Sequence, residues 1–321
     1  MKYKVFGTQT GLPASEVILG AASLGERRYG AIAEEIPQIL TAYVDAGGNF
    51  IDMADQYQYG EAEEIVGKFI EPNRDNFILC TKYTLSDEQN ALPANRGNHR
   101  KAMRQAIDAS LKRLKTDYID IYMPHFDDGL TPVDEIARGL EDLIKTGKVL
   151  YAGLANFPAW KAAAIASTIP LTALQFEYNL LKRDADRELT SMADFFGMGE
   201  MYYSPLAGGL LTGKYRKGST GRLTQSGNGY HEDTVTTAII DALETIAAEV
   251  NATTGQVALA WMLTKNGFPV IGARTLTHLK DGLNALKLHL SSDHLTHLDK
   301  ISAVTKGYPH DLLKTVQKNY G

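Results

Sequence analysis

The sequence predicts an α/β fold, a closed (β/α)8 TIM barrel with an N-terminal β-hairpin, and one domain that spans residues 1–321. Eight short apolar runs alternate with helical patterns along the chain, which is typical of a parallel sheet. A doubly wound open sheet is the alternative. It is weakened because no strand near the N-terminus is followed by a GxGxxG motif.

The strand predictions rest on apolar runs of four to eight residues. The runs cover residues 17–22, 49–52, 77–82, 118–125, 149–154, 171–177, 201–204 and 269–271, the last extending over only three residues. Turn signals at Gly7 and Gly11–Pro13 predict the hairpin before the first barrel strand.

Helices are predicted between the strands by apolar residues spaced three and four apart. Three such faces are Met103, Ile107, Leu111 and Leu114; Val133, Ile136, Leu140 and Leu143; and Val235, Ile239, Ala242, Ile246 and Val250. The second helix is predicted to begin with Thr131 as N-cap and Pro132 in the first turn. Residues 207–230 contain seven glycines and predict a long loop, either functional or disordered.

Composition narrows the possible functions. The chain has 33 basic and 38 acidic residues, and this mild acidity argues against a nucleic-acid or anionic-membrane partner. The one cysteine, Cys80, excludes an internal disulfide and a multi-cysteine zinc site, and favours a reducing compartment. The sequence shows neither the apolar core of a signal peptide nor a transmembrane run, so we expect a cytoplasmic protein.

Polar residues end three consecutive predicted strands. Asp52, Lys82 and His125 close the second, third and fourth runs, and Tyr57 follows Asp52 by five residues. Singly they could be a helix cap, a solvated strand end, a core histidine and loop packing. Because strand ends converge on one face of a barrel, together they predict an active site.

These four side chains suit the protonation of an oxygen. A tyrosine with an ordinary pKa of about 10 is a poor acid near neutrality, but a nearby cation stabilises its phenolate. Lys82 can be that cation, held by Asp52. His125 can either bind a substrate oxygen or share the proton with Tyr57. Negative charge develops on such an oxygen during carbonyl reduction, so this chemistry is the prediction.

Ordered motifs over residues 15–290 resemble the aldo-keto reductase family. They are "NFIDMADQYQYG", "GEAEEIVGKFI", "SLKRLKTDYIDIYMPHFDD", "GKVLYAGLANF", "LQFEYNLL", "YSPLAGGLLTGKY" and "PVIGARTLTHLKDGLNAL". The chain looks most similar to the bacterial reductases with a short C-terminus that are related to potassium-channel β-subunits.

The resemblance implies a barrel that binds NADPH across the strand C-termini. It also implies a catalytic tetrad of Asp52, Tyr57, Lys82 and His125, with Tyr57 as general acid in reduction. Cofactor contacts are implied at Asn156 and Gln175 for the carboxamide; at Tyr203 for the nicotinamide ring; at Ser204, Leu206, Gly208 and Lys214 for the pyrophosphate; and at Gly272, Arg274 and His278 for the adenosine phosphate.

Cofactor choice depends on Arg274, whose guanidinium can bind a 2′-phosphate and favours NADPH, although NADH stays possible. A surface arginine in a salt bridge is the alternative. Three departures from the family pattern concern the cofactor contacts. Ala155 stands where many relatives have serine, His278 replaces a common glutamine, and Gly282 replaces a common asparagine.

The substrate pocket is predicted to have aromatic walls, which suit small aldehydes and planar or apolar carbonyls. The candidates are Tyr29, Tyr59, Tyr83, Phe126 and Phe157. No metal site is predicted, because the "HFDD" stretch at 125–128 is better explained by the tetrad. Cys80 is expected to be a buried thiol in the barrel interior, below Lys82.

The predicted function is NADPH-dependent reduction of aldehydes and ketones to alcohols. An NAD(P)-dependent sugar or alcohol dehydrogenase and a non-catalytic nucleotide-sensing subunit remain as alternatives. A small-molecule carbonyl is the expected partner, with no nucleic acid and no membrane, and a homo-oligomer is possible. The physiological substrate and the direction of reaction are left open.

Overall fold

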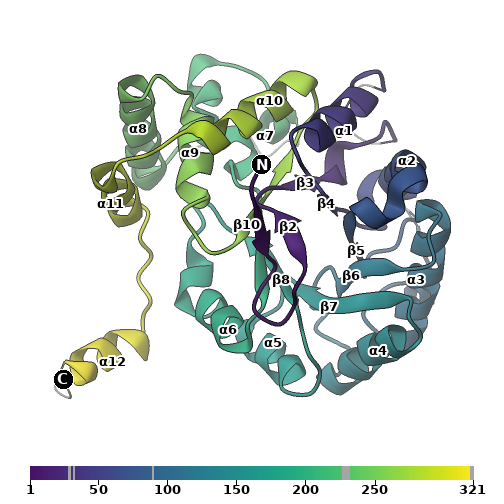
Figure 1. Ribbon diagram of the computed structural model, residues 1–321. Helices are drawn as coiled ribbons and strands as arrows, with labels where there is room; N and C mark the ends of the chain where they lie inside the picture. Colours follow the sequence, from purple (N-terminus) through teal and green to yellow (C-terminus); the bar gives the residue numbers. More distant parts are fainter. Residues whose placement is uncertain (28–29, 32, 89, 226–231, 319–321) are drawn as a thin grey trace.

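Eight parallel strands close into a barrel in the computed structural model, which describes all residues except 28–29, 32, 89, 226–231 and 319–321 (Figure 1). The order around the barrel is β10-β3-β4-β5-β6-β7-β8-β9, which confirms the predicted fold. The strands are β3 (Ile18–Gly20), β4 (Phe50–Asp52), β5 (Ile78–Tyr83), β6 (Ile119–Pro124), β7 (Val149–Ala155), β8 (Ala173–Glu177), β9 (Gly199–Tyr203) and β10 (Phe268–Gly272).

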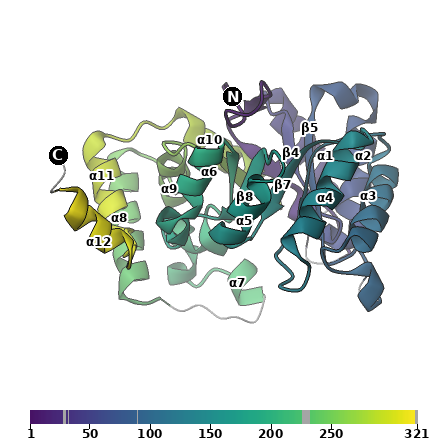
Figure 2. The ribbon, with the colours of Figure 1, turned by 90° about the horizontal axis from the view of Figure 1, so that it is seen from below.

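Helices follow the strands and most of them surround the barrel, whereas α12 lies away from it near the C-terminus, as Figure 1 shows; Figure 2 gives a second view. They are α1 (Glu35–Asp45), α2 (Glu61–Ile70), α3 (Arg100–Leu114), α4 (Val133–Lys145), α5 (Ala159–Ala166), α6 (Leu189–Phe196), α7 (Arg222–Gln225), α8 (Thr234–Glu249), α9 (Thr254–Met262), α10 (Leu276–Asn284), α11 (Ser292–Ile301) and α12 (His310–Gln317). Among the described residues, no helix is long and apolar enough to cross a membrane.

The strands are buried on both faces, because alternate side chains point into the barrel and toward the helices. Phe50, Ile78 and Cys80 belong to the apolar cluster inside the barrel. Ile51 and Leu79, their neighbours in the chain, pack in the cluster between strands and helices. The predicted position of Cys80 in the interior is confirmed, and the same alternation points Asp52 and Lys82 inward.

The N-terminal hairpin closes one end of the barrel. β1 (Tyr3–Val5) pairs antiparallel with β2 (Pro13–Ser15), as predicted. The ring of Phe6 lies 5.4 Å from that of Phe50 and 5.0 Å from that of Phe268, between ring centroids. In Figure 2 the hairpin lies at the opposite edge of the molecule from α7, so it leaves the carboxyl ends of the strands available for a site.

Two local predictions need correction. Pro132 rather than Thr131 is the N-cap of α4, because the Thr131 hydroxyl donates to the Asp128 carboxylate instead of capping the helix. The segment predicted as a long loop from residue 207 contains the short helices η6 (Ala207–Thr212), η7 (Lys214–Lys217) and α7. Residues 226–230 of that segment lie outside the described residues.

The predicted helical faces are mostly buried. Met103 and Ile107 of α3, and Ile136 and Leu140 of α4, lie in the cluster between strands and helices. The predicted face of α8 is wrong at its first position, since Val235 is 57% exposed at the start of that helix. Apolar spacing therefore located the helices but not the residue at which each one meets the barrel.

We expect Phe6→Ala to lower the free energy of unfolding by about 3–5 kcal/mol, because it leaves a cavity between two buried aromatic rings. Urea denaturation followed by circular dichroism measures this change. Tyr3→Ala is the matched control in the same hairpin, since Tyr3 is 55% exposed. Equal losses of unfolding free energy in the two variants would contradict the proposed packing of Phe6 against Phe50 and Phe268 at this end of the barrel.

Candidate active site

Unusual backbone conformations mark the carboxyl ends of the barrel strands. Among the described residues, nine residues other than glycine have a positive φ, and seven of them follow barrel strands. The seven are Gln58 and Tyr59 after β4, Thr84 and Ser86 after β5, Asn156 after β7, and Ser204 and Ala207 after β9. Such conformations concentrate at functional sites, because they cost free energy that the surrounding structure must offset.

A buried ion pair lies inside this end of the barrel. The Nζ of Lys82 donates to Oδ1 of Asp52 at 2.6 Å and to the backbone oxygen of Met53 at 2.7 Å. The side chain of Lys82 is 0% exposed. Gln175 supports the pair from β8, because its Nε2 donates to the same Asp52 oxygen at 2.9 Å. The cation is therefore paired on a rigid strand rather than on a loop.

Tyr57 and His125 complete the predicted group of four. Lys82 Nζ lies 5.3 Å from the centroid of the Tyr57 ring, and the Tyr57 and His125 rings meet edge to face at 5.7 Å. Tyr57 opens the short helix η2 (Tyr57–Gly60) after β4. The structure thus brings together the four side chains that the sequence placed on consecutive strand ends.

The protonation states follow from burial and from the ion pair. Burial lowers the pKa of Lys82, but Asp52 and Tyr57 raise it more, so that it lies above the ordinary lysine value. Burial raises the pKa of Tyr57, and Lys82 only partly offsets this rise. Burial and Lys82 together hold the pKa of His125 well below its ordinary value. Near neutral pH the group holds a charged lysine, a protonated tyrosine and a neutral histidine.

The Tyr57 result corrects the simplest form of the sequence argument, in which Lys82 lowers the tyrosine pKa below 10. Lys82 does act in that direction, but the dry surroundings act more strongly in the other. Its remaining effect is to reduce the free energy needed to form the phenolate at this place.

The His125 ring is held on several sides. It stacks on Phe126 with centroids 4.4 Å apart and planes inclined by 10°. Its backbone oxygen accepts from Asn156 Nδ2 at 2.9 Å, and Asn156 Oδ1 accepts from the Tyr203 hydroxyl at 2.8 Å. Gln56 lies next to the ring, with Nε2 3.2 Å from His125 Nδ1. The sequence alone indicates no role for Gln56, although this residue directly precedes Tyr57.

The side chains predicted to contact the nicotinamide lie beside the tetrad. Gln175 touches Asp52, and Asn156 touches both Tyr203 and the backbone of His125. Burial, followed by Glu177 and Tyr57, raises the pKa of Tyr203 to about 12. That these three residues bind the nicotinamide stays a prediction.

Positive charge gathers farther along the same end of the barrel. Burial and the charge of Arg274 lower the pKa of Lys214. Burial, then Lys214 and Arg274, lower the pKa of His278, while Asp281 and Glu35 partly oppose them. Groups that repel one another in this way suit a bound polyanion, which would relieve the repulsion.

The backbone around this cluster also suits a phosphate chain. Gly208 and Gly209 have φ of 65° and 91°, values that favour glycine, and a Cβ on Gly208 would approach Leu223 to 3.2 Å. Around Gly272, which is exposed, a Cβ would meet nothing within 4 Å, so the surface there is open. Ser204 and Leu206 lie between β9 and η6, at the start of the same segment. That these residues bind the phosphates of a dinucleotide stays a prediction.

Two of the predicted substrate walls need correction, and the others stay predictions. Tyr83 is 0% exposed and stacks on Tyr122 at 5.2 Å in the layer between strands and helices, because it alternates with the inward-pointing Lys82. Phe157 lies in the same layer. Phe126 stacks on His125, whereas Tyr59 lies in η2, two residues after Tyr57. Tyr29 lies outside the described residues.

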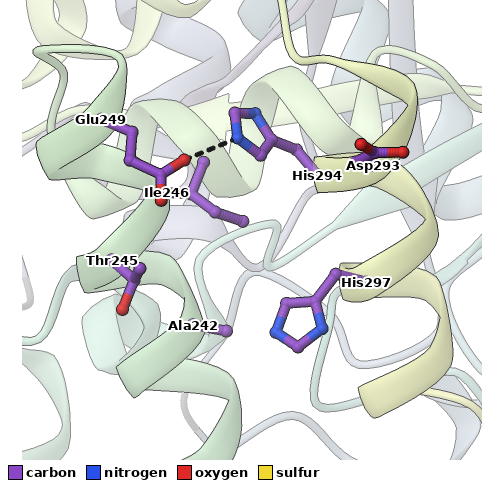
Figure 3. A pocket seen from close by; sticks show the side chains of 7 residues that line it. All are labelled: Ala242, Thr245, Ile246, Glu249, Asp293, His294 and His297. Atoms are coloured by element: carbon purple, nitrogen blue, oxygen red, sulfur yellow. Dashed lines mark hydrogen bonds and ion pairs between the residues drawn. The ribbon is translucent and has the colours of Figure 1, made fainter.

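A hollow of about 200 Å³ lies elsewhere, between α8 and α11 (Figure 3). His294 Nε2 is 2.9 Å from Glu249 Oε2 there. The lining residues are Ala242, Thr245, Ile246, Glu249, Asp293, His294 and His297. Its size is below that of ordinary cofactor sites. In the part of the chain that the structure describes, no group of three or more histidine, cysteine, aspartate or glutamate residues could hold a metal ion.

Asp55, for which the sequence suggested no role, is a further buried ionisable group near the tetrad. Its backbone nitrogen donates to the Lys82 backbone oxygen at 2.9 Å. Asp55 is 2% exposed, and its Oδ1 has no hydrogen-bond partner within the described structure. Burial, and next the charge of Glu63, raise the pKa of Asp55 well above its ordinary value, although Arg113 opposes them. The protonated form is therefore favoured in the folded state.

This raised pKa predicts a pH-dependent stability. Asp55 contributes stability that is fully present below its unfolded pKa of about 3.9 and is lost as the pH rises through its folded pKa. Asp55→Asn stays neutral, so we expect the variant to gain stability relative to the unmodified chain between pH 5 and pH 8. Urea unfolding at both values measures this. Asp117→Asn is the control, because Asp117 is exposed. The prediction would be contradicted if the difference in unfolding free energy between Asp55→Asn and the unmodified chain were the same at pH 5 and pH 8.

Comparison with known proteins agrees with this geometry. The model of the Aldo/keto reductase family matches residues 16–303. An aryl-alcohol dehydrogenase (NADP+) from Phanerodontia chrysosporium is 32% identical, with 94% of this chain and 86% of that protein covered. A norsolorinic acid reductase from Aspergillus flavus is 31% identical, with 97% and 84% covered. An aldo-keto reductase from Emericella nidulans is also 31% identical, again with 97% and 84% covered.

These relatives are fungal proteins, so the special likeness to bacterial reductases related to potassium-channel β-subunits stays a prediction. The broader expectation is confirmed by the family match, by the named reductases and dehydrogenase, and by the barrel. The chain belongs to the aldo/keto reductase family and is an NAD(P)H-dependent oxidoreductase.

Proposed function

We propose that this enzyme reduces aromatic aldehydes and related planar carbonyls to alcohols with NADPH, with Tyr57 as the proton donor. The observation that carries the proposal is the Lys82–Asp52 ion pair of 2.6 Å directly beside the Tyr57 ring. A charged lysine next to a protonated tyrosine is an arrangement that can deliver one proton to a developing alkoxide.

The proton transfer uses groups that are ready at neutral pH. The pKa of Tyr57 lies above its ordinary value because of burial, so the hydroxyl holds its proton before reaction. When the proton leaves, the charge of Lys82 stabilises the phenolate in a site with little water, where such interactions are strong. Asp52 and the Met53 oxygen keep the ammonium in place during this change.

The remaining groups would position the reactants. Asn156, Gln175 and Tyr203 would hold the nicotinamide ring, and the bound cofactor supplies the hydride. His125 would donate a hydrogen bond to the carbonyl oxygen from a ring that Phe126 and Asn156 hold in place. Orientation of this kind accounts for a large share of enzymatic rate enhancement.

NADPH is the proposed cofactor because of the cluster of Lys214, Arg274 and His278. Burial, and next Lys214 and Arg274, lower the pKa of His278, which supports a site where these groups act on one bound phosphate. A 2′-phosphate adds a doubly charged acceptor that NADH lacks, and a guanidinium can bind it with paired hydrogen bonds.

The substrate class rests on apolar groups at this end of the barrel and on the relatives. Phe126 and Tyr57 flank the His125 ring. The segments after β5, β6 and β7 expose Leu92, Leu130 and Trp160, at 69%, 88% and 67%. Such side chains favour planar, apolar substrates. The names of the aryl-alcohol dehydrogenase and the norsolorinic acid reductase point to aromatic compounds as well.

We expect Tyr57→Phe to lower kcat by about 10²–10⁴-fold with benzaldehyde as substrate, because only the proton donor is removed. The affinity for NADPH should stay nearly unchanged. NADPH oxidation followed by absorbance, together with fluorescence titration of the cofactor, measures both quantities. Tyr308→Phe, at a side chain that is 86% exposed, is the control. Turnover at the unmodified rate in Tyr57→Phe would refute the mechanism.

For cofactor choice, we expect Arg274→Ala to weaken NADPH binding about 10- to 100-fold, as for a lost hydrogen bond to a charged group. NADH binding should change much less, because NADH has no 2′-phosphate. Dissociation constants from tryptophan fluorescence test this, with Arg138→Ala on the exposed side of α4 as control. An equal loss for both cofactors would remove the 2′-phosphate from the proposal.

A further inference from the structure

We propose that Gln56 is a positioning residue that keeps His125 in one tautomer, with the ring proton on Nε2. The inference rests on the proposed carbonyl reduction for its consequence but not for its evidence. The evidence is a contact between two side chains, Gln56 Nε2 and His125 Nδ1, at 3.2 Å.

The direction of this hydrogen bond decides the tautomer. In the arrangement shown, the amide nitrogen of Gln56 faces His125 Nδ1; because an amide nitrogen can only donate, Nδ1 is the acceptor in this arrangement. A neutral imidazole carries one proton on one of its two nitrogens. With Nδ1 as acceptor, Nε2 carries the proton and is the donor on the other side of the ring.

The surroundings favour the neutral ring that this argument needs. His125 is 6% exposed. The ionisable groups that face it are Lys82 from β5 and Tyr57 from η2. Neither is an anion near neutral pH, and the one carboxylate of the tetrad, Asp52, is bound to Lys82. A second proton on His125 would lie close to a buried ammonium.

The ring also has little freedom to turn away from Gln56. Phe126 stacks on one face of the ring, and Asn156 binds the His125 backbone oxygen. The backbone nitrogen of His125 donates to the Tyr83 backbone oxygen at 2.8 Å and to Thr84 Oγ1 at 3.1 Å. Gln56 is itself held in the turn, since its backbone oxygen accepts from Tyr59 at 3.2 Å.

This assignment separates the roles of the two groups beside the carbonyl. His125 would bind the substrate oxygen through Nε2–H without giving up its proton, and Tyr57 would be the acid. The alternative left open by the sequence, in which the two residues share the proton, would need a histidine that gains and loses it. Because Gln56 and Tyr57 are adjacent in the chain, one turn would set both the hydrogen-bond donor and the acid.

Nitrogen-15 NMR of the histidine ring tests the tautomer directly and without substrate. In the unmodified protein we expect a pyridine-like Nδ1 and a pyrrole-like Nε2 for His125, identified by its loss in His125→Gln. Gln56→Met, which has similar length but no donor, should move both shifts toward the mixed-tautomer average. Gln58→Met is the matched control in the same turn, because the Gln58 amide donates to the Ala22 oxygen instead. It should leave the His125 shifts unchanged.

Gln56→Glu reverses the hydrogen bond, because a carboxylate can only accept from Nδ1–H. We expect this variant to lower kcat at least about tenfold, as the ring then lacks the correct donor. It should also add an ionisation to the pH profile of kcat, because the new carboxylate raises the pKa of His125. Binding of NADPH should be preserved, so the loss should appear in kcat.

The outcomes separate the two proposals. Two results would overturn the role of Gln56: a pyrrole-like Nδ1 in the unmodified protein, or His125 nitrogen-15 shifts that are unchanged in Gln56→Met. Correct shifts with an unaltered kcat and pH profile in Gln56→Glu would overturn its importance for the reaction. If no carbonyl is reduced by the unmodified protein, the proposed function fails, but the NMR result still decides the tautomer.

Discussion

The ion pair between Lys82 and Asp52 is the constraint on which the rest of the site depends. Both side chains are buried, so the desolvation of two charges must be offset by close pairing and by further hydrogen bonds. The Met53 oxygen and the Gln175 amide provide them, from the segment after β4 and from β8. Removal of either charge would leave the other buried without its partner. The barrel therefore has to close around this pair with its strands in one register.

That register is visible in how the strands alternate. β4 places Phe50 and Asp52 inside the barrel, and β5 places Cys80 and Lys82 there, so an apolar layer lies below a charged one. The hairpin fills the other end through Phe6. The charged layer therefore lies on the side of the barrel where the strands finish, away from Phe6. The same geometry explains why burial dominates the pKa of Tyr57 and His125.

Much of this could be predicted from the sequence, because the signals were periodic or local. The eight strands, the hairpin and the convergence of the four tetrad residues on one end followed from apolar runs and the residues that end them. The prediction for Tyr83 was wrong because it assumed that every residue at the end of a strand faces the site. Neighbouring residues on a strand face opposite ways, so Tyr83 points away from the site when Lys82 points toward it. The prediction of Thr131 as the α4 N-cap was wrong because the Thr131 hydroxyl donates its hydrogen bond to Asp128, three residues earlier. Gln56 could not be found by any periodic signal, since its contact with His125 joins residues 69 positions apart.

Gln175 and Asn156 contact the tetrad directly and lie between it and the proposed position of the nicotinamide ring. Gln175 donates to Asp52, which leaves its amide oxygen as the acceptor it could offer to a carboxamide. Asn156 is bound between His125 and Tyr203, and its φ of 56° is a conformation that asparagine tolerates better than most residues. These amides contact the tetrad on one side and lie where the nicotinamide ring is proposed on the other. A change in either amide would therefore disturb the position of the cofactor and the ion pair or histidine together. For this reason the ion pair, His125 and the two amides are best understood as one hydrogen-bonded unit, beside the proposed nicotinamide position.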